Sequence, residues 1–107
     1  MKFGRFNFED RNFYGVVENN EVHELQDNFL FSQIKTGKKF NLDKKIKILP
    51  PVVPNKMLAL AKNYGSHLQG ENPPKQPEPF FKTTSSLIGH NENIKIPNDS
   101  KKVDAES

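Results

Sequence analysis

The sequence has no cysteine and no tryptophan among its 107 residues. The lack of cysteine excludes disulfide bonds, thiolate metal ligands and a cysteine nucleophile, and with them a disulfide-stabilised secreted scaffold. No segment approaches the ~20 apolar residues of a membrane helix. Residues 1–7 are interrupted by charged and polar side chains where a signal peptide has its apolar segment. We therefore expect a cytoplasmic protein with no membrane partner.

Apolar residues are also scarce, at 34% of the chain, and phenylalanine contributes nine of them. The length fits one domain, or part of a larger one, with a modest core. The net charge of +3 and the pI near 9.2 raise the possibility of nucleic-acid binding. However, the lysines are dispersed among acidic residues, and arginine, the favoured reader of bases, occurs only at Arg5 and Arg11. A solvated lysine-rich surface is the better interpretation, with no nucleic-acid partner.

The first 25 residues alternate between apolar and polar positions, which is typical of half-buried strands. The pattern predicts strands at residues 2–8, 13–18 and 21–25. Polar turns separate them at residues 9–12 and at Asn19-Asn20, where asparagine tolerates a positive φ. The opening therefore predicts a small antiparallel β meander, which is not very stable alone.

Residues 26–45 are less regular, and Thr36-Gly37-Lys38 suggests a turn. Pro50, Pro51 and Pro54 then favour a stiff extended linker, because proline fixes φ and restricts the residue before it. We place a domain boundary there. Residues 1–54 form an N-terminal β module with its linker, and residues 55–107 begin a second domain.

The segment M-L-A-L-A at residues 57–61 is apolar at every position, which suits a strand buried on both faces. A helix over residues 57–67 is the alternative, because alanine, leucine and methionine favour helices. Pro54 before the segment and Asn63-Tyr64-Gly65 after it favour a strand and a turn. We expect one helical turn at residues 66–69, a second strand at 79–82, extended pieces at 86–89 and 94–97, and a polar tail from Asn98.

Four polar residues follow these two apolar segments and are candidates for a site. His67 can act as a general base near neutral pH, or it is a surface histidine on a short helix. Lys82 can bind a carboxylate as a point charge, or it ends a strand at the solvent. Ser85 and Ser86 can donate hydrogen bonds to an oxyanion, or they form a turn. Glu71, four residues after His67, can orient the imidazole only if the intervening turn is helical.

At this point ordered groups of residues resemble the fumarylacetoacetate hydrolase family, most closely members often called 2-hydroxyhepta-2,4-diene-1,7-dioate isomerase. The resemblance runs in order over nearly the whole chain and rests on residues 1–6, 14–18, 49–52, 54–56, Asn63-Tyr64 with His67, 81–82 with 85–89, and 96–97 with 103–104. It implies a mainly β fold, in which a small antiparallel module precedes the start of a β-rich catalytic domain. Family members use Mg²⁺ or Mn²⁺, are usually homodimeric, and hydrolyse, decarboxylate or isomerise 2-oxo or 1,3-dicarbonyl acids.

The resemblance also implies roles for individual residues. His67 corresponds to a lid histidine that acts as general base, and Lys82 to a lysine that contacts the acid group of the substrate, beside Ser85 and Ser86. Glu106 in V-D-A-E corresponds to the first metal-binding glutamate, although a solvated acidic tail is the alternative there. A second metal-binding glutamate and a later aspartate of the family have no counterpart in these residues, and one carboxylate cannot hold Mg²⁺ in an octahedral site.

Two interpretations follow for the function. In the first, the chain is the N-terminal part of a metal-dependent hydrolase or isomerase and is inactive alone, with no tightly bound metal. In the second, it is a non-catalytic stand-alone module that binds a partner chain, such as a separately encoded catalytic fragment. The family often places a glutamate three residues after the lid histidine, where this chain has Gly70. Because a partial sheet leaves strand edges unpaired, we expect a homo-oligomer or association with a complementary fragment.

Overall fold

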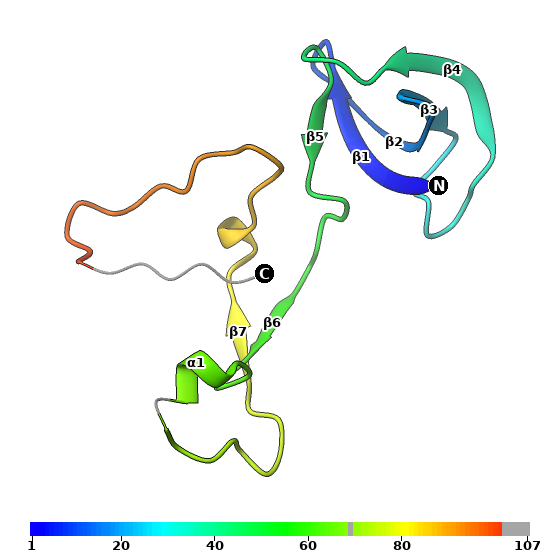
Figure 1. Cartoon of the computed structure of the whole chain (residues 1–107). Coiled ribbons are helices and arrows are strands. Elements are labelled where there is room, and N and C mark those ends of the chain that lie inside the picture. Colours follow the sequence, from blue (N-terminus) through cyan, green and yellow to red (C-terminus); the bar gives the residue numbers. More distant parts are fainter. Residues whose placement is uncertain (69, 102–107) are drawn as a thin grey trace. The chain divides into compact units, whose positions relative to one another are not determined.

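A computed structural model of the chain describes residues 1–68 and 70–101, which form two compact units (Figure 1). The first unit comprises Met1–Pro50 and the described residues from Ile88 onward, and the second comprises Pro51–Leu87. The described residues are mainly β, as expected from the sequence. None of their helices has the length and apolar character needed to cross a membrane.

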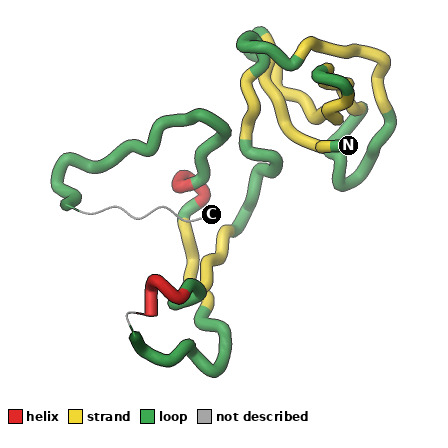
Figure 2. Tube along the Cα trace, viewed as in Figure 1, coloured by secondary structure: helices red, strands yellow, loops and turns green. Residues whose placement is uncertain are grey.

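The first unit is built on a five-stranded antiparallel sheet (Figure 2). Its strands are β1 (Lys2–Phe8), β2 (Arg11–Glu18), β3 (Glu21–Leu25), β4 (Lys35–Asn41) and β5 (Lys47–Leu49). They lie in the order β4-β3-β2-β1-β5, so the three strands expected from the alternating pattern form the predicted meander. Two more strands, β4 and β5, flank it.

Tight two-residue turns connect the first three strands. Glu9 and Asp10 have φ values of 48° and 61°, and Asn19 and Asn20 have values of 47° and 64°. Two successive residues with positive φ define the type I′ turn that matches the twist of a β-hairpin. Asparagine tolerates a positive φ, so Asn19-Asn20 suits this turn. Glu9 adopts the same conformation although glutamate does not favour it.

The core of this unit consists mainly of large side chains from β1, β2 and β3. Phe6, Phe13, Val22 and Ile46 are buried together, and Val22 has no exposed surface. The Phe6 and Phe13 rings lie with their centroids 5.8 Å apart. Gly15, on β2, faces Gly4 across the β1–β2 pair. A Cβ atom on Gly15 would lie 2.6 Å from Val22 Cγ1, so glycine is needed here for space.

The sequence-based turn at Thr36-Gly37-Lys38 is wrong, because these residues lie within β4. Gly37 has a φ of +91°, and the pairing of β4 with β3 shifts register between His23 and Leu25. This irregular edge strand is largely exposed and carries lysines, so it lacks the apolar alternation that identifies a strand in a sequence.

The second unit contains a two-stranded antiparallel sheet of β6 (Met57–Leu60) and β7 (Pro79–Lys82). The predicted strands are confirmed, but the expected burial of β6 on both faces is wrong: Leu58 is 64% exposed and Leu60 is 45% exposed. The predicted helical turn is the four-residue helix α1 (Gly65–Leu68), and a 3₁₀ helix (Thr84–Ser86) follows β7.

The segment after Leu87 belongs to the first unit by its contacts. Glu92 forms an ion pair with Lys47 of β5 at 2.7 Å and accepts a hydrogen bond from the Gly89 amide. The expected extended pieces at residues 86–89 and 94–97 form no strands, and Ser86 belongs to the 3₁₀ helix instead. The proposed division into domains of residues 1–54 and 55–107 stays a prediction.

Candidate functional site

The β6–β7 hairpin provides the framework for the candidate site residues. Met57 pairs with Lys82 at one end of the hairpin, and Leu60 pairs with Pro79 at the other. These ends are three positions apart on each strand, which corresponds to about 10 Å at the usual rise of a β-strand. The segment that leads to His67 leaves the hairpin after Leu60 (Figure 1). His67 therefore follows one end of the hairpin and Lys82 marks the opposite end.

His67 lies in α1 and its side chain is exposed. Its ring meets the Tyr64 ring edge-on, with centroids 5.8 Å apart and an angle of 72° between the planes. The His67 amide donates a hydrogen bond to the Tyr64 carbonyl at 2.9 Å. The imidazole is thus positioned by an aromatic neighbour on the same turn, and it is accessible to a substrate and to water.

Lys82 ends β7 and is half-buried. Its Nζ atom lies 5.7 Å from the centroid of the Phe80 ring, in a cation–π contact. This contact places the ammonium group on the face of the hairpin that also carries Met57 and Ala59, because alternate residues of a strand share a face. The lysine is held near the strand instead of extending freely.

Ser85 and Ser86 lie in the 3₁₀ helix directly after β7. The Ser85 hydroxyl donates to Thr83 Oγ1 at 3.0 Å, and the Ser86 hydroxyl donates to the Thr83 carbonyl at 2.7 Å. These bonds support the turn interpretation of both serines. A substrate oxyanion would have to replace Thr83 as the acceptor.

Glu71 is engaged by a lysine. Its Oε2 atom lies 2.6 Å from Lys62 Nζ, and the helix that carries His67 ends at Leu68. The hydrogen bond from Lys62 lowers the pKa of Glu71, and the same bond raises the pKa of Lys62. Lys62 has a φ of +52°. The sequence could not reveal this pair, because it depends on the turn after β6.

The described residues do not provide a metal centre. Across residues 1–68 and 70–101, no three histidine, aspartate or glutamate side chains converge in a way that could hold a metal ion. Glu106, the expected metal ligand, lies outside the described residues. The donor set that the structure describes therefore does not fit Mg²⁺, which requires several oxygen ligands in near-octahedral geometry.

An open hollow of about 240 Å³ lies beside the hairpin, between the end of β6 and the proline-rich segment. Leu60, Lys62 and Asn63 line one side of it, and residues 73–77 line the other. The hollow contains none of the four candidate residues that the structure describes. No motif in the sequence indicated it.

Two family models match successive parts of the chain. The family described as Rv2993c-like, N-terminal, matches residues 1–51, and the family described as fumarylacetoacetate (FAA) hydrolase C-terminal matches residues 56–107. An uncharacterized protein of Pyrococcus abyssi is 49% identical over 57 residues, which are 51% of this chain and 25% of the relative. The mitochondrial oxaloacetate tautomerase Fahd2a of Rattus norvegicus is 39% identical over 64 residues, or 57% of this chain and 20% of the tautomerase.

A solved structure agrees with these matches. The 5-carboxymethyl-2-hydroxymuconate delta-isomerase of Mycobacterium smegmatis superposes with a TM-score of 0.77 and 26% identity, over 94% of this chain and 40% of the isomerase chain. The fold is thus that of a group of hydrolases and isomerases. The chain belongs to the fumarylacetoacetate hydrolase family and corresponds to its N-terminal part, so the resemblance expected from the sequence is confirmed. It spans a quarter or less of the length of the two curated relatives.

Proposed function

We propose that the chain supplies the general base and the carboxylate-binding side of a metal-dependent hydrolase or isomerase of 2-oxo or 1,3-dicarbonyl acids. The observation that carries the proposal is that His67 and Lys82 both lie in residues 56–107, which match the catalytic family. Lys82 is at one end of the hairpin, and His67 is in the short helix that follows the other end. Two relatives are named a tautomerase and an isomerase of organic acids, which supports proton transfer in such an acid as the reaction type.

Keto–enol conversion moves a proton from the carbon beside a carbonyl group to the carbonyl oxygen. In the proposed reaction, the His67 imidazole acts first as a general base, which accepts the proton from carbon, and then as a general acid, which donates a proton to the carbonyl oxygen. The Lys82 ammonium group holds a carboxylate of the substrate as a point charge.

We also propose that the described residues are inactive without further parts of the catalytic domain. Family members are generally metal-dependent, and the metal would stabilise the charge that develops on the substrate oxygen. The described residues hold no cluster suited to it. The exposed imidazole of His67 also lies where water competes with the substrate, whereas acid–base sites of this kind exclude water during the reaction.

The experiment follows oxaloacetate tautomerisation by its ultraviolet absorbance, with and without Mg²⁺. The chain alone should not accelerate the reaction. When the chain replaces the matching segment of the R. norvegicus tautomerase, His67→Gln should lower kcat about 100-fold or more, and Lys82→Gln should mainly raise KM. His90→Gln serves as the control, because His90 is an exposed histidine in the other unit.

Two results would contradict the proposal. If the His67→Gln fusion is active with an unchanged kcat, His67 is not the general base. Tight stoichiometric Mg²⁺ binding by the chain alone, measured by calorimetry, would show that its metal site is complete.

A further inference from the structure

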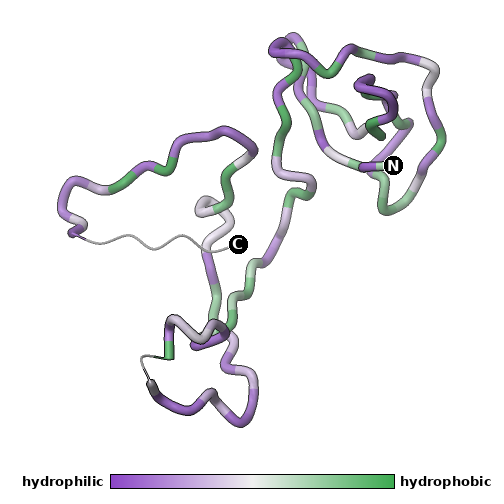
Figure 3. Tube along the Cα trace, in the orientation of Figure 1, coloured by the Kyte–Doolittle hydropathy of each residue, from purple (hydrophilic) through white to green (hydrophobic). Residues whose placement is uncertain are grey.

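One face of the β6–β7 hairpin is apolar and uncovered. Leu58 and Leu60 are two residues apart on β6 and so share a face, and the register places Phe81 and Pro79 opposite them on β7. Leu58, Leu60 and Phe81 are 64%, 45% and 77% exposed, respectively. These four residues form what we call the Leu58–Phe81 face. It contains no charged side chain and lies within the hydrophobic part of the hairpin (Figure 3).

The opposite face of the hairpin is better covered. Met57, Ala59 and Lys82 are half-buried there, and the Phe80 ring carries the contact with the lysine ammonium group. The sequence of β6 is apolar at all four positions, which is the pattern of a strand with both faces covered. Phe80 on the opposite face is still 38% exposed, so neither face is fully buried, but the Leu58–Phe81 face is the more exposed of the two. This exposed apolar surface indicates that the Leu58–Phe81 face packs against another layer of protein.

The edges of the two sheets support this argument. The edge strand β4 of the first unit carries Lys35, Lys38 and Lys39, and lysines on an edge strand discourage pairing with another chain. In the second unit, β6 pairs only with β7 among the described strands, and neither carries a charge between its ends. A two-stranded hairpin of this kind is marginal alone and gains stability from a third strand or a covering layer.

We propose that the Leu58–Phe81 face binds the remaining β-rich part of the family's catalytic domain, as a continuation of the same polypeptide or as a separate chain. The hairpin lies in the segment that matches the catalytic family. The aligned 94% of this chain accounts for 40% of the M. smegmatis isomerase, so most of that fold has no counterpart in these residues. An apolar surface of that unaligned part of the fold is the partner that matches the apolar character of this face. The inference rests on family membership and does not depend on the proposed reaction.

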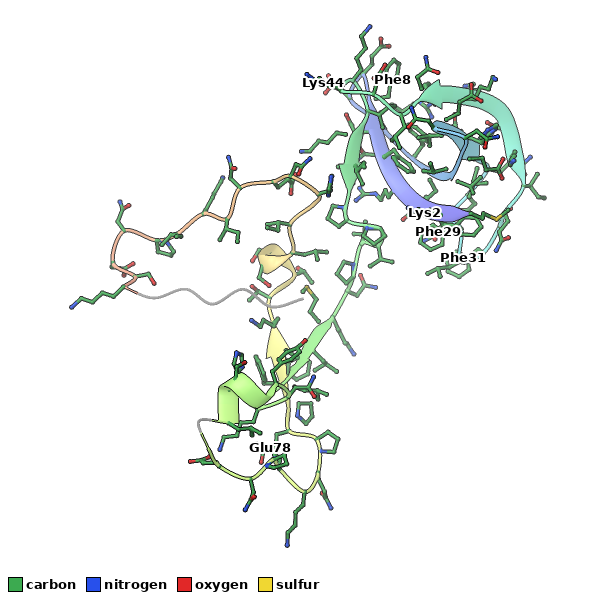
Figure 4. The ribbon with its side chains drawn as sticks, viewed as in Figure 1. Lys2, Phe8, Phe29, Phe31, Lys44 and Glu78 are labelled. Carbon is green, nitrogen blue, oxygen red and sulfur yellow. The ribbon has the colours of Figure 1, made fainter. Side chains whose placement is uncertain are left out.

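The test uses the full chain and, as probe, the P. abyssi protein from which the segment aligned with this chain has been removed. Calorimetry and sedimentation should show a complex with one copy of each. The double variant Leu58→Lys/Phe81→Lys should weaken binding at least tenfold. The matched control is Leu30→Lys/Phe31→Lys in the first unit, where the same residue types are 64% and 82% exposed. Phe31 is labelled in Figure 4. The control variant should bind like the unmodified chain.

Circular dichroism of each variant checks that the β structure remains, and the single variant Phe81→Glu provides a second test with the opposite charge. Absence of a complex overturns the proposal. Equal weakening by both double variants also overturns it, because binding would then be non-specific adhesion. A homodimer that the hairpin variant dissociates, without binding of the probe, would identify a second copy as the partner instead. A complex that forms but lacks activity would leave this inference standing and contradict the proposed function.

Discussion

Replacing Glu24 with glutamine should destabilise the first unit by about 2 kcal/mol. Glu24 is the one charged residue buried in the described part of the chain, at 8% exposure. Its two carboxylate oxygens accept hydrogen bonds from Arg11 Nη1 at 2.7 Å and Nη2 at 3.1 Å. The guanidinium group of Arg11 also lies 4.9 Å from the centroid of the Phe13 ring. Glutamine keeps the size of the side chain and removes its charge.

The magnitude follows from the unequal burial of the two partners. Exposed ion pairs contribute about 0–1 kcal/mol, and breaking a fully buried pair costs about 3–5 kcal/mol. The Glu24 side chain is 11% exposed, whereas that of Arg11 is 46% exposed, so the arginine stays partly hydrated when its partner is lost. The expected cost therefore lies between the two ranges.

The effect should depend on pH with a definite sign. The hydrogen bond from Arg11 holds the pKa of Glu24 below its ordinary value of 4.5. Protonation therefore favours the unfolded chain, so the stabilisation is fully present above the ordinary pKa and is lost as the pH falls through the folded-state pKa. The difference in unfolding free energy between the wild type and Glu24→Gln should be largest near pH 7 and should shrink in acid.

Urea unfolding followed by far-ultraviolet circular dichroism measures this difference across the pH range. The control is Glu18→Gln, which removes a surface ion pair with Lys35 in which both side chains are more exposed than Glu24. It should have a smaller effect near neutral pH. Equal stability of Glu24→Gln and wild type at neutral pH would refute the reasoning, as would a difference that persists unchanged in acid.

Two further changes test the backbone of the first unit, both by urea unfolding. Gly15→Ala should cost about 1–3 kcal/mol, because the new methyl group would lie 2.6 Å from Val22 Cγ1; Gly65→Ala, with open space around it, should be nearly neutral. Glu9→Asn with Asp10→Gly should stabilise by about 1 kcal/mol, because both positions have positive φ; unchanged or lower stability would contradict the turn assignment.

The strands of the first unit could be predicted because their information is local. Residues 2–8 alternate along one strand, and Asn19-Asn20 favours a positive φ without help from the rest of the chain. By contrast, β4 could not be predicted. Its residues include Gly37 and three lysines, and they become a strand only because β3 presents an edge to pair with.

The candidate site shows the same division between local and distant information. The positions of His67 after β6 and Lys82 at the end of β7 followed from local patterns. The ion pair between Glu71 and Lys62 could not be predicted in this way, because no sequence motif specifies the turn that brings the two residues together. The exposure of Leu58 was also missed, because an apolar sequence predicts that a strand is covered and not which chain covers it.

The alternation of β7 separates the two roles proposed for the hairpin. Lys82 and Phe80 point to one face, and Phe81, between them in the sequence, points to the other. Protein that covers Phe81 therefore leaves the lysine ammonium group on the opposite face, where it can bind a carboxylate. Docking of the missing layer and binding of the substrate then use different sides of the same two strands. A single short hairpin can serve both, because adjacent residues of a strand face opposite directions.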